Sequence, residues 1–316
     1  MRRRSVLRVL VLTAFLCAFA SNACASLVIT GTFTSNFNTF FGSNAAAAQA
    51  AWNAAAAVFM ANFSDNIHIN ITVDAVSGTS ILGQSTTSLI GVSYANMRTL
   101  LVTDSKSGDD AIAVGAGGSI TSADPTGGAG NWWFARGQAK ALGFILDDLT
   151  NDGTTTFGAG FSYTFSGAIA PGTFDFQGVV AHEITEVMGR LGICGGTIGP
   201  FSNSYSVLDD FSYSGAGTKG LGNGAGNSFS VNGGTTLVKG FNNAASNGGD
   251  CRDWASGAND AFNAFSSSGV SNPISATDLR VMDVIGYDLA TPEPATMALI
   301  GMGLCLLAGI KKVRRK

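Results

Sequence analysis

Basic residues, histidine and glutamate are scarce in this chain of 316 residues, of which only 12% are charged. Four arginines lie in the first 25 residues and five cations in the last six, which leaves nine basic residues in 26–291. The same stretch holds twenty acidic residues, so its net charge is about −11. Nucleic acids and anionic lipid surfaces attract clustered lysine and arginine, and this negative charge therefore argues against either as a partner.

The first 25 residues have the organisation of a secretory signal peptide. Three arginines, Arg2 to Arg4, come first, an apolar run covers 6–20, and Ala23-Cys24-Ala25 supplies small residues at the spacing that a signal peptidase accepts. The apolar run is short for a membrane span. We therefore predict cleavage after Ala25, with an uncleaved anchor as the alternative.

The last residues form a second signal. Pro292, Glu293 and Pro294 precede an apolar run at 295–310 and a basic tail, an order that fits the positive-inside rule. The arrangement resembles the PEP-CTERM sorting signal of Gram-negative bacteria that make extracellular polysaccharide. The resemblance implies an exosortase-type sorting machinery as a partner. It also implies an inner-membrane-anchored precursor that is sorted to the cell surface or secreted, with a permanent transmembrane anchor as the alternative.

Cysteine is scarce as well. Of five cysteines, Cys17 and Cys24 belong to the predicted signal peptide and Cys305 to the C-terminal apolar run, which leaves Cys194 and Cys251. Two cysteines in an exported domain most simply form one disulfide, and a pair of free buried thiols is the alternative. The stretch 26–291 is long enough to bury a core as one large ectodomain.

The pattern along 26–291 mixes helices and strands. We expect a strand at 27–33, an alanine-rich helix at 44–63 capped by Asn44, and a strand at 67–73 with isoleucines on one face. The stretch 108–130 is predicted as a loop holding a short strand at 111–114. After 202 we expect mostly turns and short strands, with a hairpin around Asn232-Gly233-Gly234 in 228–238.

A helix with apolar residues at spacings of three and four follows Thr173 or Asp175, either of which is a plausible N-cap, and Gly192 is its plausible end. It contains the sequence VVAHEITEVMGR. His182 and Glu186 are four residues apart on it and can reach one ion, while Glu183 lies about 100° further round.

Two ligands one turn apart, with a glutamate that activates water, are the arrangement that zinc peptidases use. Between 26 and 291 both glutamates and one of the two histidines fall within five consecutive residues, so chance clustering is improbable. The alternative is a surface helix on which Glu186 pairs with Arg190 and His182 is solvated.

The run His182-Glu183-x-x-Glu186-x-x-Gly189 resembles the metzincin-like helix of the zincin metallopeptidases, with glutamate in place of the second histidine. More closely, the chain resembles bacterial secreted metalloprotease-like proteins with PEP-CTERM tails, through FDFQGVVAHEITEVMGR, SFSVNGGTTLVKGFN, GGDCRDW and ATDLRVMDVIGYDL. The resemblance implies an α+β zincin-like domain: a twisted mixed sheet, the active-site helix, and a glycine-rich C-terminal part of loops and short strands.

By the same resemblance His182 and Glu186 bind the metal and Glu183 is the general base. The third ligand of the metzincins would fall at Gly192, which has no side chain to coordinate with. The candidates in its place are Asp209, or alternatively Asp210, Asp250 or Asp253, the last two being near Cys251. Zinc is the expected metal, and a set of one histidine with several carboxylates leaves calcium or manganese open.

Two functions follow as hypotheses. The first is an exported metalloendopeptidase that hydrolyses extracellular protein or peptide with a metal-activated water. The second is a catalytically inactive zincin-fold surface or matrix protein associated with exopolysaccharide. A glycosidase would need a pair of carboxylates, and none stands out apart from this helix.

Overall fold

Three parallel strands and one antiparallel strand form the sheet on which the helix with the motif packs. The computed structural model describes residues 26–255 and 257–290. β1 (Val28–Phe33), β2 (His68–Val76) and β6 (Gly153–Gly158) run parallel, and β3 (Gly83–Thr87) pairs antiparallel with β6 at the sheet edge. Every second side chain of β2, from Ile69 onward, is buried, as the alternation in the sequence predicts.

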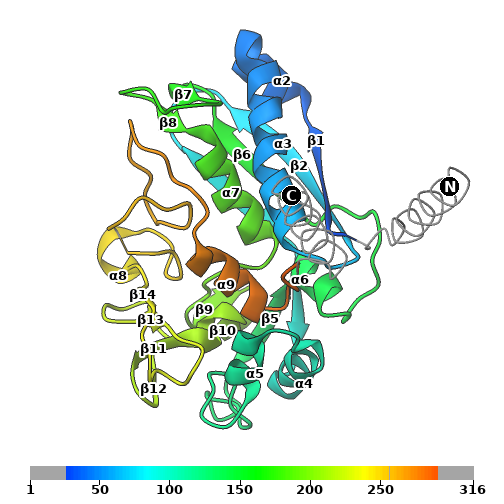
Figure 1. The fold of residues 1–316 in the computed structure, drawn as a ribbon, viewed down its shortest axis with the longest axis vertical. Helices are drawn as coiled ribbons and strands as arrows, with labels where there is room; N and C mark the ends of the chain where they lie inside the picture. The colour runs from blue at the N-terminus through cyan, green and yellow to red at the C-terminus, as the bar shows by residue number, and fades with distance from the viewer. Residues whose placement is uncertain (1–25, 256, 291–316) are drawn as a thin grey trace, which may run out of the picture. The chain divides into compact units, whose positions relative to one another are not determined.

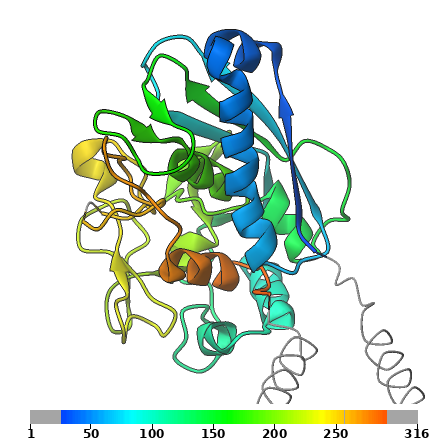
Figure 2. The same ribbon diagram turned by 45° about the horizontal axis from the view of Figure 1, so that its top comes forward.

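Two helices cover one face of this sheet. The chain passes from β1 through α2 (Ser35–Phe41) and η1 (Gly42–Asn44) into α3 (Ala45–Asn62). α3 contacts β1, and α7 (Phe176–Val187) contacts both β3 and β6. Figures 1 and 2 show α3 and α7 side by side, and their contacts agree. The fully buried Trp52 of α3 fills the space between this helix and the sheet, where its indole N–H donates to Thr155 Oγ1 at 3.3 Å.

The remaining elements form three smaller sheets and several short helices. The second sheet has the order β4 (Leu89–Val92), β5 (Asn131–Ala135), β10 (Phe201–Ser206), β9 (Gly196–Ile198). The third has the order β12 (Thr218–Lys219), β11 (Ser212–Gly215), β13 (Ser228–Phe229), β14 (Lys239–Gly240), and β7 (Tyr163–Thr164) pairs with β8 (Phe174–Asp175). The other helices are α4 (Tyr94–Asp104), α5 (Gly108–Val114), α6 (Arg136–Ala141), η2 (Leu208–Phe211), α8 (Ala244–Asn247) and α9 (Ala276–Val284). The fold is therefore a mixed α+β architecture.

Several local predictions are wrong for identifiable reasons. Asn44 does not cap α3 through its side chain, because α2 and η1 run directly into α3 and Asn44 already has near-helical backbone angles. The stretch 108–114 is the helix α5 and not a loop with a strand. Ser107 Oγ accepts from the Asp110 N–H, and the Asp110 carboxylate accepts from the Ser107 N–H, which is a capping box.

The region after 202 contains a helix that we did not predict and a more open hairpin than expected. The helix α9 begins with a second capping box, formed by Ser275 and Asp278. β13 and β14 do pair antiparallel, but nine residues separate them instead of a tight turn at Asn232-Gly233-Gly234.

Helix α7 ends at Val187, earlier than the predicted end at Gly192. Gly189 has φ +114°, a backbone conformation that residues with a side chain rarely adopt, so the helix cannot continue through it. The Arg190 N–H then donates to the Thr185 carbonyl at 2.9 Å. The chain therefore folds back at this point, and Arg190 lies against the last turn of the helix instead of extending from it.

The predicted signal peptide at 1–25, the Pro292-Glu293-Pro294 motif and the apolar run at 295–310 lie outside the described residues. Within 26–255 and 257–290, no helix is long and apolar enough to cross a membrane. Residues Ser26–Leu289 form one compact unit with its own core.

Candidate functional site

The first turn of α7 is fixed by a cap and by a cluster of aromatic rings. Asp175 accepts a hydrogen bond from the Gly178 N–H at 3.1 Å, which satisfies a free donor of the helix start. Its other oxygen accepts from the Asn272 N–H at 2.9 Å, so the same carboxylate ties the C-terminal part to α7. Phe176 packs against four rings with centroid distances of 4.9–5.6 Å: Phe41, Phe157, Tyr163 and Phe165.

Three candidate ligand side chains converge one turn further along α7. His182 Nε2 lies 3.3 Å from Glu186 Oε1 and 3.5 Å from Asp253 Oδ2. One ligand atom from each of the three residues lies within 4.8 Å of the other two. Asp253 comes from the segment after α8, far from α7 in the sequence, and is 3% exposed. The structure thus brings His182 and Glu186 together with one of the four candidate aspartates.

Neighbouring groups hold these side chains in place. His182 Nδ1 is 2.8 Å from the Ala261 carbonyl oxygen, which can only accept, so Nδ1 carries the proton that it donates there. That bond turns Nε2 toward Glu186 and Asp253. Ser85 on β3 donates from Oγ to Glu186 Oε2 at 2.7 Å. Bonds of this kind to the far side of a ligand are typical of metal sites.

Arg190 is buried beside the same carboxylates, with 1% of its surface exposed. Its guanidinium pairs with Asp253 Oδ1 through Nη1 and lies 3.4 Å from Glu186 Oε1 through Nη2. The guanidinium also stacks over the Phe262 ring at 4.3 Å. The sequence alternative of a Glu186–Arg190 pair is therefore present, but the pair is buried and not on a solvated surface.

Glu183 lines a cleft of about 260 Å³ that also exposes His182, Glu186 and Asp253. Glu183 is 5% exposed, and its Oε2 has no hydrogen-bond partner among the described residues. Gly83 on β3 lets this carboxylate approach, because a Cβ there would lie 2.3 Å from Glu183 Oε1. Burial, followed by the charge of Glu186, raises the pKa of Glu183 well above its usual range.

The charges of the cluster are strongly coupled. Burial lowers the pKa of His182, but the carboxylates of Asp253 and Glu186 outweigh it, and the pKa rises to about 10. Burial raises the pKa of Glu186, but His182 and Arg190 outweigh it, and the pKa falls to about 2. Without a metal ion, the imidazole is therefore cationic at neutral pH.

The favoured third ligand, Asp209, lies elsewhere. Its carboxylate accepts from the Ser206 N–H at 2.7 Å and the Cys194 N–H at 3.1 Å, and it pairs with Arg252 Nε at 2.8 Å. With no exposed surface and these partners already in place, it is not available to an ion at His182. Asp209 therefore lies outside the cluster, and of the four predicted candidates it is Asp253 that the structure places against His182 and Glu186.

The other two aspartates have different positions. Asp210 is buried and pairs with Lys219, and it accepts from Tyr94 Oη at 3.0 Å, so it too is outside the cluster. Asp250 lines the cleft beside the cluster and its side chain reaches solvent. Partial burial, followed by the charges of Asp253 and Glu186, raises the pKa of Asp250 to about 6.

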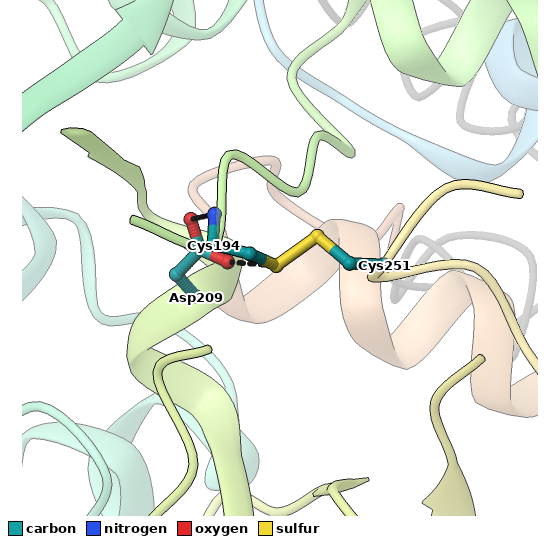
Figure 3. A group of neighbouring side chains, drawn as sticks. All are labelled: Cys194, Asp209 and Cys251. Carbon is teal, nitrogen blue, oxygen red and sulfur yellow. Dashed lines mark hydrogen bonds between the residues drawn. A yellow bond between two sulfur atoms is a disulfide. The ribbon is translucent and has the colours of Figure 1, made fainter. Parts of the chain in front are cut away.

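The disulfide between Cys194 and Cys251 connects the segment after α7 to the segment with Asp253, as Figure 3 shows together with Asp209. Cys194 Sγ is 3.2 Å from Asp209 Oδ1, but a disulfide sulfur carries no proton to donate, so this is a contact only. Because the two sulfurs are bonded to each other, they do not offer thiolates to a metal. The disulfide instead limits how far Asp253 can move from His182.

Sequence reasoning missed the roles of Ser85 and Ala261 in this site, and it expected the pair of Arg190 with Glu186 only on a solvated surface. Ser85 and Ala261 act through chain segments that only the tertiary fold brings to α7. Arg190 could have been found from Gly189, since a glycine just before an arginine allows the chain to turn back over the helix end.

Comparisons with known proteins bear on the C-terminus. Residues 290–316 match the PEP-CTERM protein-sorting motif. A comparison with the curated proteins found no match, and neither did a comparison with the solved structures. The motif indicates an exported protein of a Gram-negative bacterium that is anchored in the membrane during sorting, and it implies an exosortase-type sorting machinery as a partner.

Proposed function

We propose that the chain is an exported metal-dependent peptidase, in which His182, Glu186 and Asp253 hold the metal ion and Glu183 is the general base. The observation that carries the proposal is the convergence of three ligand atoms within 4.8 Å beside a buried, unpartnered carboxylate oxygen. A buried acceptor without a partner costs free energy, so its position in an open cleft favours a ligand that donates to it.

The donor set fits zinc. Imidazole nitrogen and carboxylate oxygen are ordinary zinc ligands, and three protein ligands leave a position free for chemistry. Two carboxylates make the set harder than two histidines would, so manganese or calcium can compete. A divalent cation bound there would lower the pKa of a water molecule and polarise the carbonyl oxygen of a substrate.

Charge balance supports the same assignment. His182, neutral when it binds a metal, leaves Glu186 and Asp253 with two negative charges and Arg190 with one positive charge. A divalent ion brings this sum to one positive charge, which an ionised Glu183 cancels. The site is therefore neutral when the metal is bound and Glu183 is a carboxylate, the form that a general base needs.

Glu183 has the position that proton transfer requires. Its carboxyl group lines the cleft, and burial raises its pKa toward the range in which a carboxylate accepts and then returns a proton. We infer that it takes the proton of the attacking water and delivers it to the leaving amine.

The wall of the cleft favours an extended peptide as the substrate. Residues 82–85, in and just before β3, line the cleft, and β3 is the edge strand of its sheet. An edge strand offers free backbone N–H and C=O groups that an extended chain can pair with. A peptide along β3 would pass next to Glu183 and Glu186. A zincin-like fold remains our prediction for this arrangement.

Arg190 favours a second candidate function. Together with a cationic His182 it balances the charges of Glu186 and Asp253, so the buried carboxylates are compensated without any metal. In that case the chain is a catalytically inactive surface or matrix protein associated with exopolysaccharide.

Hydrolysis of a quenched fluorescent peptide library by residues 26–290 separates the two candidates. The proposal predicts zinc-dependent hydrolysis that chelation abolishes, and a loss of about 10²-fold or more in Glu183→Gln, because a general base contributes rate factors of this size. The Glu183→Gln variant should still bind zinc. Equal rates in the wild type and Glu183→Gln would refute the assigned role of Glu183.

A further inference from the structure

The cleft around the proposed metal site is lined by five carboxylates: Glu183, Glu186, Asp250, Asp253 and Asp260. Three of them have cationic partners in the structure. Glu186 and Asp253 contact both His182 and Arg190, and Asp260 pairs with Lys239. Among the described residues, no ion pair forms at Asp250. With a divalent ion bound and Glu183 ionised, the charge that remains in the cleft is therefore that of Asp250.

The buried side-chain atoms that lack a hydrogen-bond partner in the cleft are acceptors. Besides Glu183 Oε2, the buried Oδ1 of Asn263, which also lines the cleft, has no partner within the described part of the chain. Its Nδ2 donates to the Ala258 carbonyl at 2.8 Å, which settles which end of the amide is the oxygen. No buried side-chain donor lining the cleft lacks a partner in 26–255 and 257–290.

A ligand that complements these walls brings donors and a positive charge. Neutral peptide groups bring one donor for each acceptor that they add, whereas an ammonium or guanidinium group brings three or five donors and no acceptor. Gly248 lines the cleft close to Asp250, and a Cβ at Gly248 would meet no atom within 4 Å, so this part of the wall is open.

We propose that Asp250 is a specificity residue that selects peptides with a lysine or arginine side chain next to the bond that is cleaved. The inference rests on the proposed peptidase function for the reaction, but the recognition of the cation rests on Asp250 and the unpartnered Asn263 Oδ1, both of which remain in Glu183→Gln.

Binding of matched peptides tests this without requiring turnover. The probes are acetylated, amidated, fluorescein-labelled alanine-glycine octapeptides that carry lysine, norleucine or glutamate at one central position. Zinc-loaded Glu183→Gln protein, residues 26–290, binds them without consuming them, and fluorescence anisotropy gives the affinities. We expect the lysine peptide to bind about tenfold tighter than the norleucine peptide, because an ion-paired hydrogen bond contributes roughly this factor. Moderate salt should reduce the difference.

Two further variants in the same background separate specificity from general charge. Asp250→Asn removes the charge at nearly constant shape and should abolish the lysine preference while zinc content stays unchanged. Asp148→Asn removes another exposed carboxylate, which lies outside the cleft, and it should preserve the preference. Equal affinity for lysine and norleucine peptides, or a preference that survives Asp250→Asn, would overturn the inference.

Hydrolysis by the wild type distinguishes failure of this inference from failure of the proposed function. Cleavage that ignores lysine would overturn the role of Asp250 and leave the peptidase. Lysine-selective binding that Asp250→Asn abolishes, with no cleavage by the wild type, would support the recognition site and overturn the peptidase.

Discussion

Replacement of Arg190 by methionine should destabilise the metal-free protein strongly and the zinc-bound protein much less. Arg190 is buried, and it contacts Asp253 and Glu186, whose side chains are 4% and 9% exposed. Removing one partner of a buried ion pair costs about 3–5 kcal/mol, because the other charge stays buried without compensation. For a domain of this size the loss lowers Tm by roughly 10 °C.

Zinc should reverse roughly half of that loss of stability. In Arg190→Met the cluster has one more negative charge, so a cation binds more tightly to it than to the wild type. Because the coupling between the arginine and the ion is reciprocal, the gain in zinc affinity equals the stability that zinc restores. A gain of about 10–100-fold corresponds to a coupling of about 1–3 kcal/mol.

The assay is thermal unfolding with excess zinc and with excess chelator, and Arg252→Met is the matched control. Arg252 is also buried and pairs with a buried aspartate, Asp209, which has no contact with the metal cluster. Both variants should lose stability in chelator, and zinc should restore only Arg190→Met beyond its effect on the wild type. An equal zinc effect in all three proteins would refute the coupling of Arg190 to a metal site.

Three further predictions concern protons and the disulfide. The pKa of His182 is about 10 without metal, so below pH 10 a zinc ion must displace a proton from His182 in order to bind. The apparent affinity for zinc should therefore rise about tenfold per pH unit between pH 6 and 8, which competition with a chelator can measure. Burial and the charge of Asp288 raise the pKa of Asp65 from 3.8 to about 7, so this carboxyl stabilises the fold below pH 4, and that contribution is lost as pH rises through 7. Between pH 5 and pH 8, urea unfolding should show a loss of stability that is smaller in Asp65→Asn than in the wild type by up to roughly 3 kcal/mol. Replacing Cys194 and Cys251 by serine removes a crosslink over 57 residues, which should lower the free energy of unfolding by about 4 kcal/mol. It should also weaken zinc binding, because Asp253 follows Cys251 by two residues. An unchanged zinc affinity would show that the disulfide does not position Asp253.

Local patterns predicted the elements that build the site. The alternation of Ile69, Ile71 and Val73 indicated β2, and the spacing of Phe176, Val180 and Ile184 indicated α7, because each pattern comes from burial on one face. The cap at Asp175 follows from the chemistry of helix starts.

Capping boxes explain the helices that sequence reasoning missed. Ser107 with Asp110 and Ser275 with Asp278 both have the spacing of a capping box, with aspartate in place of the usual glutamate. Neither α5 nor α9 is long, so their apolar periodicity is weak. A search for capping boxes would have predicted both helices, which the apolar periodicity does not indicate.

The third ligand of the proposed metal site could not be predicted from the spacing of residues in the sequence. Asp209 and Asp253 both lie near an arginine and both are connected to the disulfide region. What separates them is the direction of each carboxylate, which depends on how the segment after α8 packs against α7. That packing is a tertiary property, and no local pattern carries it.

Metal content per chain tests the central claim most directly. Residues 26–290 would be purified, exposed to zinc, dialysed, and measured by elemental mass spectrometry, together with His182→Ala, Asp253→Asn and the control His68→Ala. His68 is the other histidine of the chain, and it pairs with Asp147 at 2.7 Å, outside the cluster. The account predicts about one zinc per chain in the wild type and His68→Ala, and little in His182→Ala and Asp253→Asn. A wild type without bound metal, or zinc that remains when His182 and Asp253 are replaced, would contradict it.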